Sequence, residues 1–136
     1  MKYLLFLFIM ANVFIFTGCE KGTDFSNNPP RINLITPSLS GPVGGIVIIK
    51  ADLEDDYVLK YVKLKNTALG LDQTIYISIK NVATKADLDV IKSSENFSYN
   101  FTIPNTAVSG DTYEITMEVK NATGQISSVT INLTIS

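Results

Sequence analysis

The chain has 136 residues, with 11 lysines and arginines against 13 acidic residues, a single cysteine and no histidine or tryptophan. This length suffices for one hydrophobic core but not for two. The absence of histidine excludes Ser-His and Cys-His catalysis and removes the commonest transition-metal ligand. The mildly acidic balance, without basic clusters, argues against a nucleic-acid partner, because neutralising phosphates requires lysine and arginine.

Residues 1–18 form the most apolar part of the chain. A positive charge at Lys2 is followed by an apolar run from Leu4 to Phe16 and then by small residues before Cys19. This order is typical of a secretory signal peptide that is removed from the mature protein. The apolar run would make about 20 Å of helix, which is too short to span a hydrocarbon core of roughly 30 Å comfortably.

The sequence Phe16-Thr17-Gly18-Cys19 resembles the bacterial lipobox, whose cysteine is diacylated and becomes the first mature residue. Phe16 departs from the leucine that is usual at the first position of this motif. The alternative is an ordinary signal peptide with a coincidental cysteine. The resemblance implies that Cys19 carries a lipid, and two or three acyl chains attach a protein stably to a membrane.

The residues after Cys19 bear on the destination of the anchored protein. Glu20 is not the aspartate of the inner-membrane retention signal, so the resemblance implies the outer membrane. Glu20 and Asp24 are similar to the acidic export signal of surface lipoproteins of the Bacteroidota, but Lys21 lies between them. The sequence therefore leaves open whether the protein faces the cell surface or the periplasm.

Residues 19–30 are rich in Gly, Ser, Asn and Pro and predict a flexible tether. From residue 31 onward the chain is a series of short runs in which apolar and polar residues alternate, separated by turn residues. This pattern is typical of an antiparallel all-β sandwich with solvated outer faces. We therefore predict a signal peptide at 1–18, a lipidated tether at 19–30 and a β-sandwich domain at 31–136.

Seven strands are expected in this domain. Pro37 should end the first strand. Pro104 should end the fifth, because proline cannot continue a central strand. The segment from Thr84 to Lys92 is compatible with a helical turn or with an insertion loop, so no structure is assigned to residues 82–95. The predicted strands cover residues 31–36, 46–53, 58–65, 71–81, 97–103, 110–120 and the run through 129–135.

The stretch from Pro30 to Ser136 resembles a bacterial immunoglobulin-like or fibronectin type III-like module. The resemblance is carried by strand motifs such as Pro30-Arg-Ile-Asn-Leu-Ile-Thr-Pro37, Phe101-Thr-Ile-Pro104 and Gly110-Asp-Thr-Tyr-Glu-Ile115. The chain is also similar to small Bacteroidota lipoproteins and to the N-terminal sandwich of glycan-binding lipoproteins from polysaccharide-uptake systems. The resemblance implies a seven-stranded immunoglobulin-like sandwich in which the Tyr113 hydroxyl bonds to upstream backbone, as a tyrosine corner.

One dense acidic cluster consists of Asp52, Glu54, Asp55 and Asp56. Carboxylates at one end of a sandwich could gather Ca²⁺, which prefers six to eight oxygen ligands. The alternative is structural, because an aspartate in a tight turn bonds to nearby backbone amides. Asp52 should point outward from its strand while the other three lie in the turn, so calcium stays a hypothesis. No other cofactor is expected.

Three tyrosines form the second candidate site. Tyr61 and Tyr76 fall on the outward phases of consecutive predicted strands, and Tyr57 lies just before the first of these strands. If the strands pair, the rings of Tyr61 and Tyr76 could form a flat platform for a sugar ring or for the apolar patch of a protein. The alternative is ordinary cross-strand stabilisation, worth about 0.2–1 kcal/mol.

No catalytic residue is expected. The acidic residues are predicted in turns and on solvated faces, whereas carboxylate catalysis requires a shaped cleft that raises one pKa. We therefore expect a non-enzymatic, lipid-anchored module that contacts a glycan or an outer-membrane uptake component. The alternative is a structural envelope protein that holds a protein partner through a sheet edge or a solvated face.

Overall fold

The computed structural model describes residues 28–78 and 92–136. All the regular elements in these ranges are strands, so this part of the chain has no helix long and apolar enough to cross a membrane. The predicted signal peptide, Cys19 and most of the tether lie outside the described residues. So do residues 79–81 of the fourth predicted strand and residues 84–91 of the ambiguous segment.

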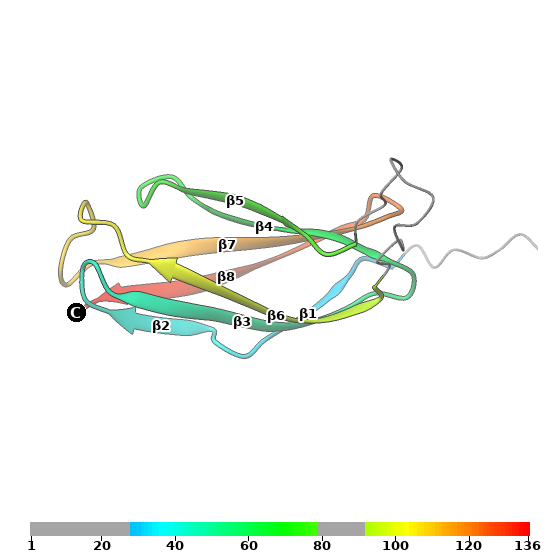
Figure 1. Ribbon diagram of the computed structural model, residues 1–136, viewed down its shortest axis with the longest axis horizontal. Coiled ribbons are helices and arrows are strands. Elements are labelled where there is room, and N and C mark those ends of the chain that lie inside the picture. Colours follow the sequence, from blue (N-terminus) through cyan, green and yellow to red (C-terminus); the bar gives the residue numbers. More distant parts are fainter. Residues whose placement is uncertain (1–27, 79–91) are drawn as a thin grey trace, which may run out of the picture.

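Two sheets pack face to face in the described part of the chain (Figure 1). The first is three-stranded, in the order β1 (Arg31–Leu34), β3 (Ile46–Glu54) and β6 (Ser94–Thr102). The second is five-stranded, in the order β2 (Ser38–Gly41), β8 (Ile126–Ile135), β7 (Thr112–Asn121), β4 (Leu59–Asn66) and β5 (Leu71–Tyr76). The all-β sandwich predicted from the alternating pattern is confirmed.

The first predicted strand corresponds to β1. A further strand that was not predicted, β2, follows it and belongs to the other sheet. β1 pairs antiparallel with β3, whereas β2 lies beyond Pro37 and pairs parallel with β8. Pro37 has no N–H with which to continue the β3 ladder, and its carbonyl instead accepts a hydrogen bond from the Asn132 N–H of β8. The prediction of seven antiparallel strands was therefore wrong: the described residues form eight strands, and one pair is parallel.

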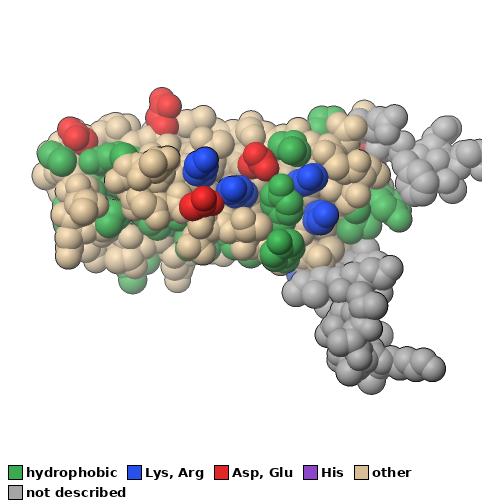
Figure 2. All heavy atoms as spheres, turned by 90° about the horizontal axis from the view of Figure 1, so that it is seen from above, with side chains coloured by type: hydrophobic (Ala, Val, Ile, Leu, Met, Phe, Trp, Pro, Cys, Tyr) green, Lys and Arg blue, Asp and Glu red, His purple; other side chains and the backbone are tan. Residues whose placement is uncertain are grey.

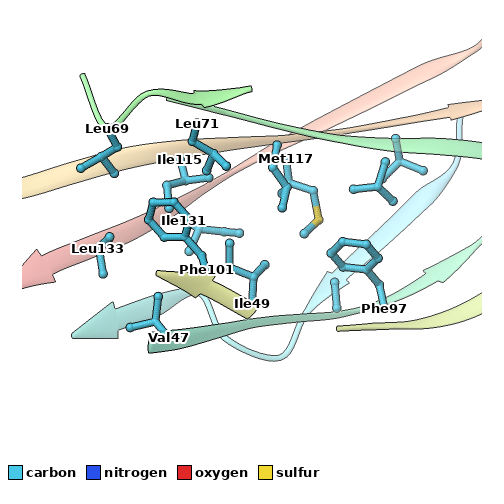
Figure 3. Close-up of a cluster of buried hydrophobic side chains, with 14 of the residues drawn as sticks. Val47, Ile49, Leu69, Leu71, Phe97, Phe101, Ile115, Met117, Ile131 and Leu133 are labelled. Atoms are coloured by element: carbon cyan, nitrogen blue, oxygen red, sulfur yellow. The ribbon is translucent and has the colours of Figure 1, made fainter. Parts of the chain in front are cut away.

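The hydrophobic core lies between the inner faces of the two sheets, where the alternation predicts it. Figure 3 shows Ile49 and Phe101 of the three-stranded sheet meeting Ile115 and Ile131 of the five-stranded sheet. Burying each of these side chains contributes about 1.5–3 kcal/mol. The fully buried side chains of the described residues include Ile49, Leu53, Leu59, Leu64, Ile103, Ile115, Met117, Ile131, Leu133 and Ile135.

The link from β6 to β7 contains the expected tyrosine corner. The Val108 N–H donates a hydrogen bond of 3.1 Å to the Tyr113 hydroxyl. Gly110, between these two residues, has a φ of 90°, a conformation that glycine adopts without steric cost. This corner, together with the division of β1 and β2 between the two sheets, gives the sandwich an immunoglobulin-like arrangement.

The last three residues of the predicted tether lie against the domain. The Asn28 side-chain amide donates to Asp56 Oδ2 at 3.1 Å, and the Asn28 carbonyl accepts from Asn121 Nδ2 at 3.4 Å. Pro30 is buried, and its carbonyl accepts a hydrogen bond from the Ser127 hydroxyl. Residues 28–30 thus contact the end of the sandwich before β1 begins at Arg31.

Candidate functional site

The tyrosines on β4 and β5 meet as the alternation predicts. Tyr61 and Tyr76 are directly opposite each other in the antiparallel β4–β5 ladder. Their ring centroids are 6.2 Å apart and the ring planes are inclined by 76°, so the rings form an edge-to-face pair. Aromatic pairs favour this arrangement, which is worth about 0.5–1.5 kcal/mol beyond the area they bury. Because the rings are nearly perpendicular, they do not form the flat platform that the sequence suggested.

Two side chains of β7 contact Tyr61. Its hydroxyl donates to Glu118 Oε1 at 3.3 Å, and Lys120 Nζ lies 6.0 Å from its ring centroid. The β4–β7 register explains both contacts, because it sets Tyr61 opposite Lys120 and Lys63 opposite Glu118. Partial desolvation of the phenol, followed by the negative charge of Glu118, raises the pKa of Tyr61. Tyr61 is therefore a neutral hydrogen-bond donor at physiological pH.

The outer face around the tyrosine pair has mixed charge. Lys63 follows Tyr61 on the same side of β4, and its ammonium group is 3.5 Å from Asp72 Oδ1 of β5. Figure 2 looks onto this face and shows lysine and acidic side chains interspersed beside a green hydrophobic patch. Exposed ion pairs of this kind contribute about 0–1 kcal/mol, so an approaching partner can rearrange them at little cost.

The two members of the tyrosine pair differ in exposure. Tyr76 exposes 61% of its surface, whereas Tyr61 is only partly exposed. Tyr57, the third predicted residue, lies in the turn between β3 and β4 and not in the paired part of β4 and β5. It is 47% exposed, and its backbone N–H donates to Asp55 Oδ2 at 3.0 Å. The candidate binding surface is therefore the outer face of β4, β5 and β7, centred on Tyr61 and Tyr76.

The acidic cluster does not converge on one point. Asp55 is buried, and it accepts hydrogen bonds from the Tyr57 backbone and from Asn121 Nδ2, the latter at 3.0 Å. This is the structural role that an aspartate in a turn was expected to have. Asp52 stays on the outer face of β3, opposite Asn96.

The other two acidic residues flank one arginine. Arg31 Nη1 is 3.0 Å from Asp56 Oδ1, and Arg31 Nη2 is 3.5 Å from Glu54 Oε2. The hydrogen bond to Asp56 is the main reason that the pKa of Arg31 is raised. Within residues 28–78 and 92–136, no three Asp, Glu, Cys or His side chains are close enough together to hold a metal ion. Among the described residues, Asp52, Glu54, Asp55 and Asp56 therefore do not gather into a group of three carboxylates.

Asn121 is a key residue that the sequence analysis did not single out. Its side chain is 1% exposed, and besides its bond to Asp55 it accepts from the Gln125 N–H at 2.8 Å and from the Thr123 hydroxyl at 2.9 Å. Asn121 thus joins the β7–β8 turn to the β3–β4 turn. The sequence Asn-Ala-Thr-Gly predicts a turn at this place, but it carries no sign of a partner 66 residues away.

Comparison with protein-family models gives no match, and comparison with curated proteins gives no relative. Among solved structures, the chain is similar to the BIgI domain of beta protein from S. agalactiae, solved bound to CEACAM1, with 13% identity and a TM-score of 0.43. That match covers 79% of this chain and 96% of the other chain. It is also similar to human titin ZIg10, with 18% identity and a TM-score of 0.40, covering 79% and 76% of the two chains. Both neighbours are immunoglobulin-like domains, whereas the fold described above rests on the strand order and the tyrosine corner.

Proposed function

We propose that this chain is a non-enzymatic binding module of the bacterial outer membrane, anchored by lipid on Cys19, and that it contacts a protein partner through the outer face of β4, β5 and β7. The observation that carries this proposal is the exposed Tyr61–Tyr76 pair within a surface of mixed charge.

The geometry of the tyrosine pair favours a protein over a glycan as the partner. A sugar ring stacks on an open aromatic face, but the two rings are nearly perpendicular and Lys120 lies over the face of Tyr61. Protein interfaces instead take most of their binding energy from a few aromatic anchors, enclosed by polar residues that exclude water. Interspersed charges such as Lys63 and Asp72 add specificity, because they repel partners that lack the complementary pattern.

The N-terminal contacts support a domain that is held close to its anchor. Residues 28–30 are bound at the end of the sandwich that carries the β3–β4 and β7–β8 turns. Residues 19–27 then remain as the proposed tether, which could extend about 30 Å when fully stretched. The end of the sandwich that binds residues 28–30 would stay within this reach of the membrane.

The partner surface can be tested by photo-crosslinking in intact cells. A photoreactive phenylalanine in place of Tyr76 should give one discrete protein adduct. Reversing the neighbouring charges with Lys63→Glu and Lys65→Glu should remove that adduct. The matched control is the same photoreactive residue at Thr130, an exposed position on the outer face of β8 in the same sheet.

Equal adducts at positions 76 and 130, or none at position 76, would contradict the proposed surface. Retention of the purified protein on an immobilised polysaccharide, with loss of retention in Tyr76→Ala, would assign the surface to a glycan instead.

The anchor needs a separate test. The wild-type protein should incorporate an alkyne analogue of palmitate and sediment with outer membranes, whereas Cys19→Ser should do neither. A Cys19→Ser protein that still sediments with membranes would contradict the lipid anchor. Protease treatment of intact cells that carry a C-terminally tagged protein would then show which side of the membrane it faces.

A further inference from the structure

Among the described residues, β6 forms a long sheet edge without the usual protection against pairing. Within the described part of the chain it pairs with β3 alone. The edges formed by β1 and β2 are four residues long, and β5 has six residues and places Asp72 beside Lys63. β6 has nine residues, contains no proline, lysine or arginine, and carries one charge, Glu95, which is bound to Lys92 at 2.6 Å. Natural sheets shorten, charge or interrupt their edges to prevent association with other chains.

Hydrogen bonds at the two ends of the β3–β6 ladder show which backbone groups of β6 face outward. The Ile103 N–H donates to the Gly45 carbonyl at 2.8 Å, and the Asp55 N–H donates to the Ser93 carbonyl at 2.8 Å. In an antiparallel pair, hydrogen-bonded positions alternate along each strand. The odd-numbered residues of β6 therefore bond to β3, and the even-numbered residues direct their N–H and C=O groups toward the open edge.

The same even-numbered residues carry a self-complementary row of side chains. All are exposed, uncharged and capable of hydrogen bonding, and the row reads nearly the same in both directions from its centre. An antiparallel copy centred on Ser98 would set Asn96 against Asn100 without bringing like charges together. An interface with twofold symmetry requires this kind of self-complementarity. The row consists of Ser94, Asn96, Ser98, Asn100 and Thr102.

The space beside β6 is hollowed. A hollow of about 240 Å³ is lined by Tyr76 and its two neighbours on one side and by Asn96, Phe97 and Ser98 on the other. In Figure 1, β6 runs along the near side of the sandwich, next to β3. The end of β5 and the middle of β6 thus leave a gap between the two sheets beside Ser98.

We propose that β6 pairs antiparallel with β6 of a second copy of this chain, so that the two three-stranded sheets form one continuous sheet across a twofold axis at Ser98. This interface uses the edge of the three-stranded sheet, whereas the proposed function uses the outer face of β4, β5 and β7, and Tyr76 lines the hollow where the two surfaces adjoin. Antiparallel pairing also sets the two tether ends at opposite ends of the dimer. The dimer would therefore lie along the membrane with one tether at each end.

Cysteine crosslinking of the full-length protein in intact cells tests the pairing and its register. Residues opposite each other at a hydrogen-bonded position have Cα atoms about 5.5 Å apart, within the range that a disulfide spans. Ser98→Cys should therefore give a covalent dimer after brief oxidation, and Ser128→Cys, an exposed position on β8, should not. Co-expressed Asn96→Cys and Asn100→Cys chains, carrying different tags, should form mixed dimers more readily than either forms with itself.

A proline variant gives a test without crosslinking. Ser98→Pro removes an N–H that faces the open edge but leaves the ladder with β3 intact, and such prolines are tolerated on edge strands. The wild-type protein, extracted in detergent, should have the mass of a dimer by light scattering. Ser98→Pro should have half that mass, with a melting transition still present to show that it folds.

The proposal is overturned if the wild-type protein is monomeric or if Ser98→Cys crosslinks no more than Ser128→Cys. It is also overturned if Ser98→Pro folds and stays dimeric. The two proposals can fail separately, because Ser98→Pro acts on β6, whereas Lys63→Glu and Lys65→Glu act on β4, outside the hollow that Tyr76 shares with Ser98.

Discussion

The outer faces of the two sheets follow the same alternation but present different chemistry. On the five-stranded sheet, Tyr61 and Tyr76 contact each other, and neighbouring lysines and acidic residues pair across strands. On the three-stranded sheet, Ile46 and Ile48 expose 67% and 41% of their surfaces next to the uncharged row of β6. The five-stranded face combines an exposed aromatic pair with cross-strand ion pairs, whereas the three-stranded face exposes aliphatic side chains beside an uncharged row and has its ion pairs at the end that carries Arg31.

This difference shows how a small sandwich can separate stability from recognition. The inner residues of both sheets bury the same kinds of aliphatic side chain, and they determine the fold. The outward positions contribute little to the core, so each face can differ in the surface it offers. The five-stranded sheet offers aromatic anchors with charges, and the three-stranded sheet offers an uncharged edge.

The largest effect should come from the inner positions that the two sheets share. Ile49 and Ile131 lie on opposite sheets and are both 0% exposed, so replacing either with alanine should destabilise the protein by about 2–5 kcal/mol in urea unfolding. Thr130→Ala, one residue away on the outer face, should change stability by less than about 0.5 kcal/mol. If Thr130→Ala lowers the free energy of unfolding as much as Ile131→Ala does, the assignment of Ile131 to the core and of Thr130 to the solvated face is wrong.

A smaller effect should distinguish the two outer faces. A double-mutant cycle of Tyr61→Ala and Tyr76→Ala should give a coupling of about 0.5–1 kcal/mol, because the two rings contact each other. Ile48 and Asn100 are also directly opposite on neighbouring strands, but on the three-stranded sheet. Their cycle should give a coupling near zero, because an aliphatic and an amide side chain gain little from each other. Equal couplings would remove the contrast between the faces.

The smallest effect concerns ionisation of Tyr61. Its raised pKa means that the folded state disfavours the phenolate, so this contribution to stability is complete below about pH 10 and is lost as the pH rises through the folded-state pKa. In an ultraviolet titration of the folded protein, the absorbance change that is lost in Tyr61→Phe should occur at a higher pH than for a free tyrosine. Glu118→Gln should lower that pH, because it removes the neighbouring negative charge. A titration that Glu118→Gln does not move would show that the carboxylate has no influence on Tyr61.

Local signals predicted much of the sandwich because they depend on near neighbours in the chain. The alternation of β3 sets Val47, Ile49, Ala51 and Leu53 toward the core, as expected. The tyrosine corner was expected from the resemblance to immunoglobulin-like modules, and it too is a local feature, since Tyr113 bonds to a residue only five positions upstream. In contrast, the four residues of β2 are too few to show a clear alternation, so that strand and its parallel pairing with β8 were missed.

For the candidate sites, the sequence identified residue types but not their relations in space. It indicated that Tyr61 and Tyr76 share an outer face, but not that their rings are nearly perpendicular or that Tyr61 contacts Glu118 of β7, 57 residues away. It identified the acidic cluster, but not that Arg31 and Asn121 divide it between them.

The sequence by itself determined which side of each long strand is buried, because a period of two residues is a local property of an extended chain. It also determined the polar row of β6, because every second residue of this strand is uncharged and polar. Only the tertiary structure decided that β6 lies at an edge while the equally polar β8 lies inside its sheet. Strand order depends on residues that are distant in the sequence. The backbone groups that pair the strands are the same whatever the side chains, so a strand's own sequence does not show which strands lie beside it.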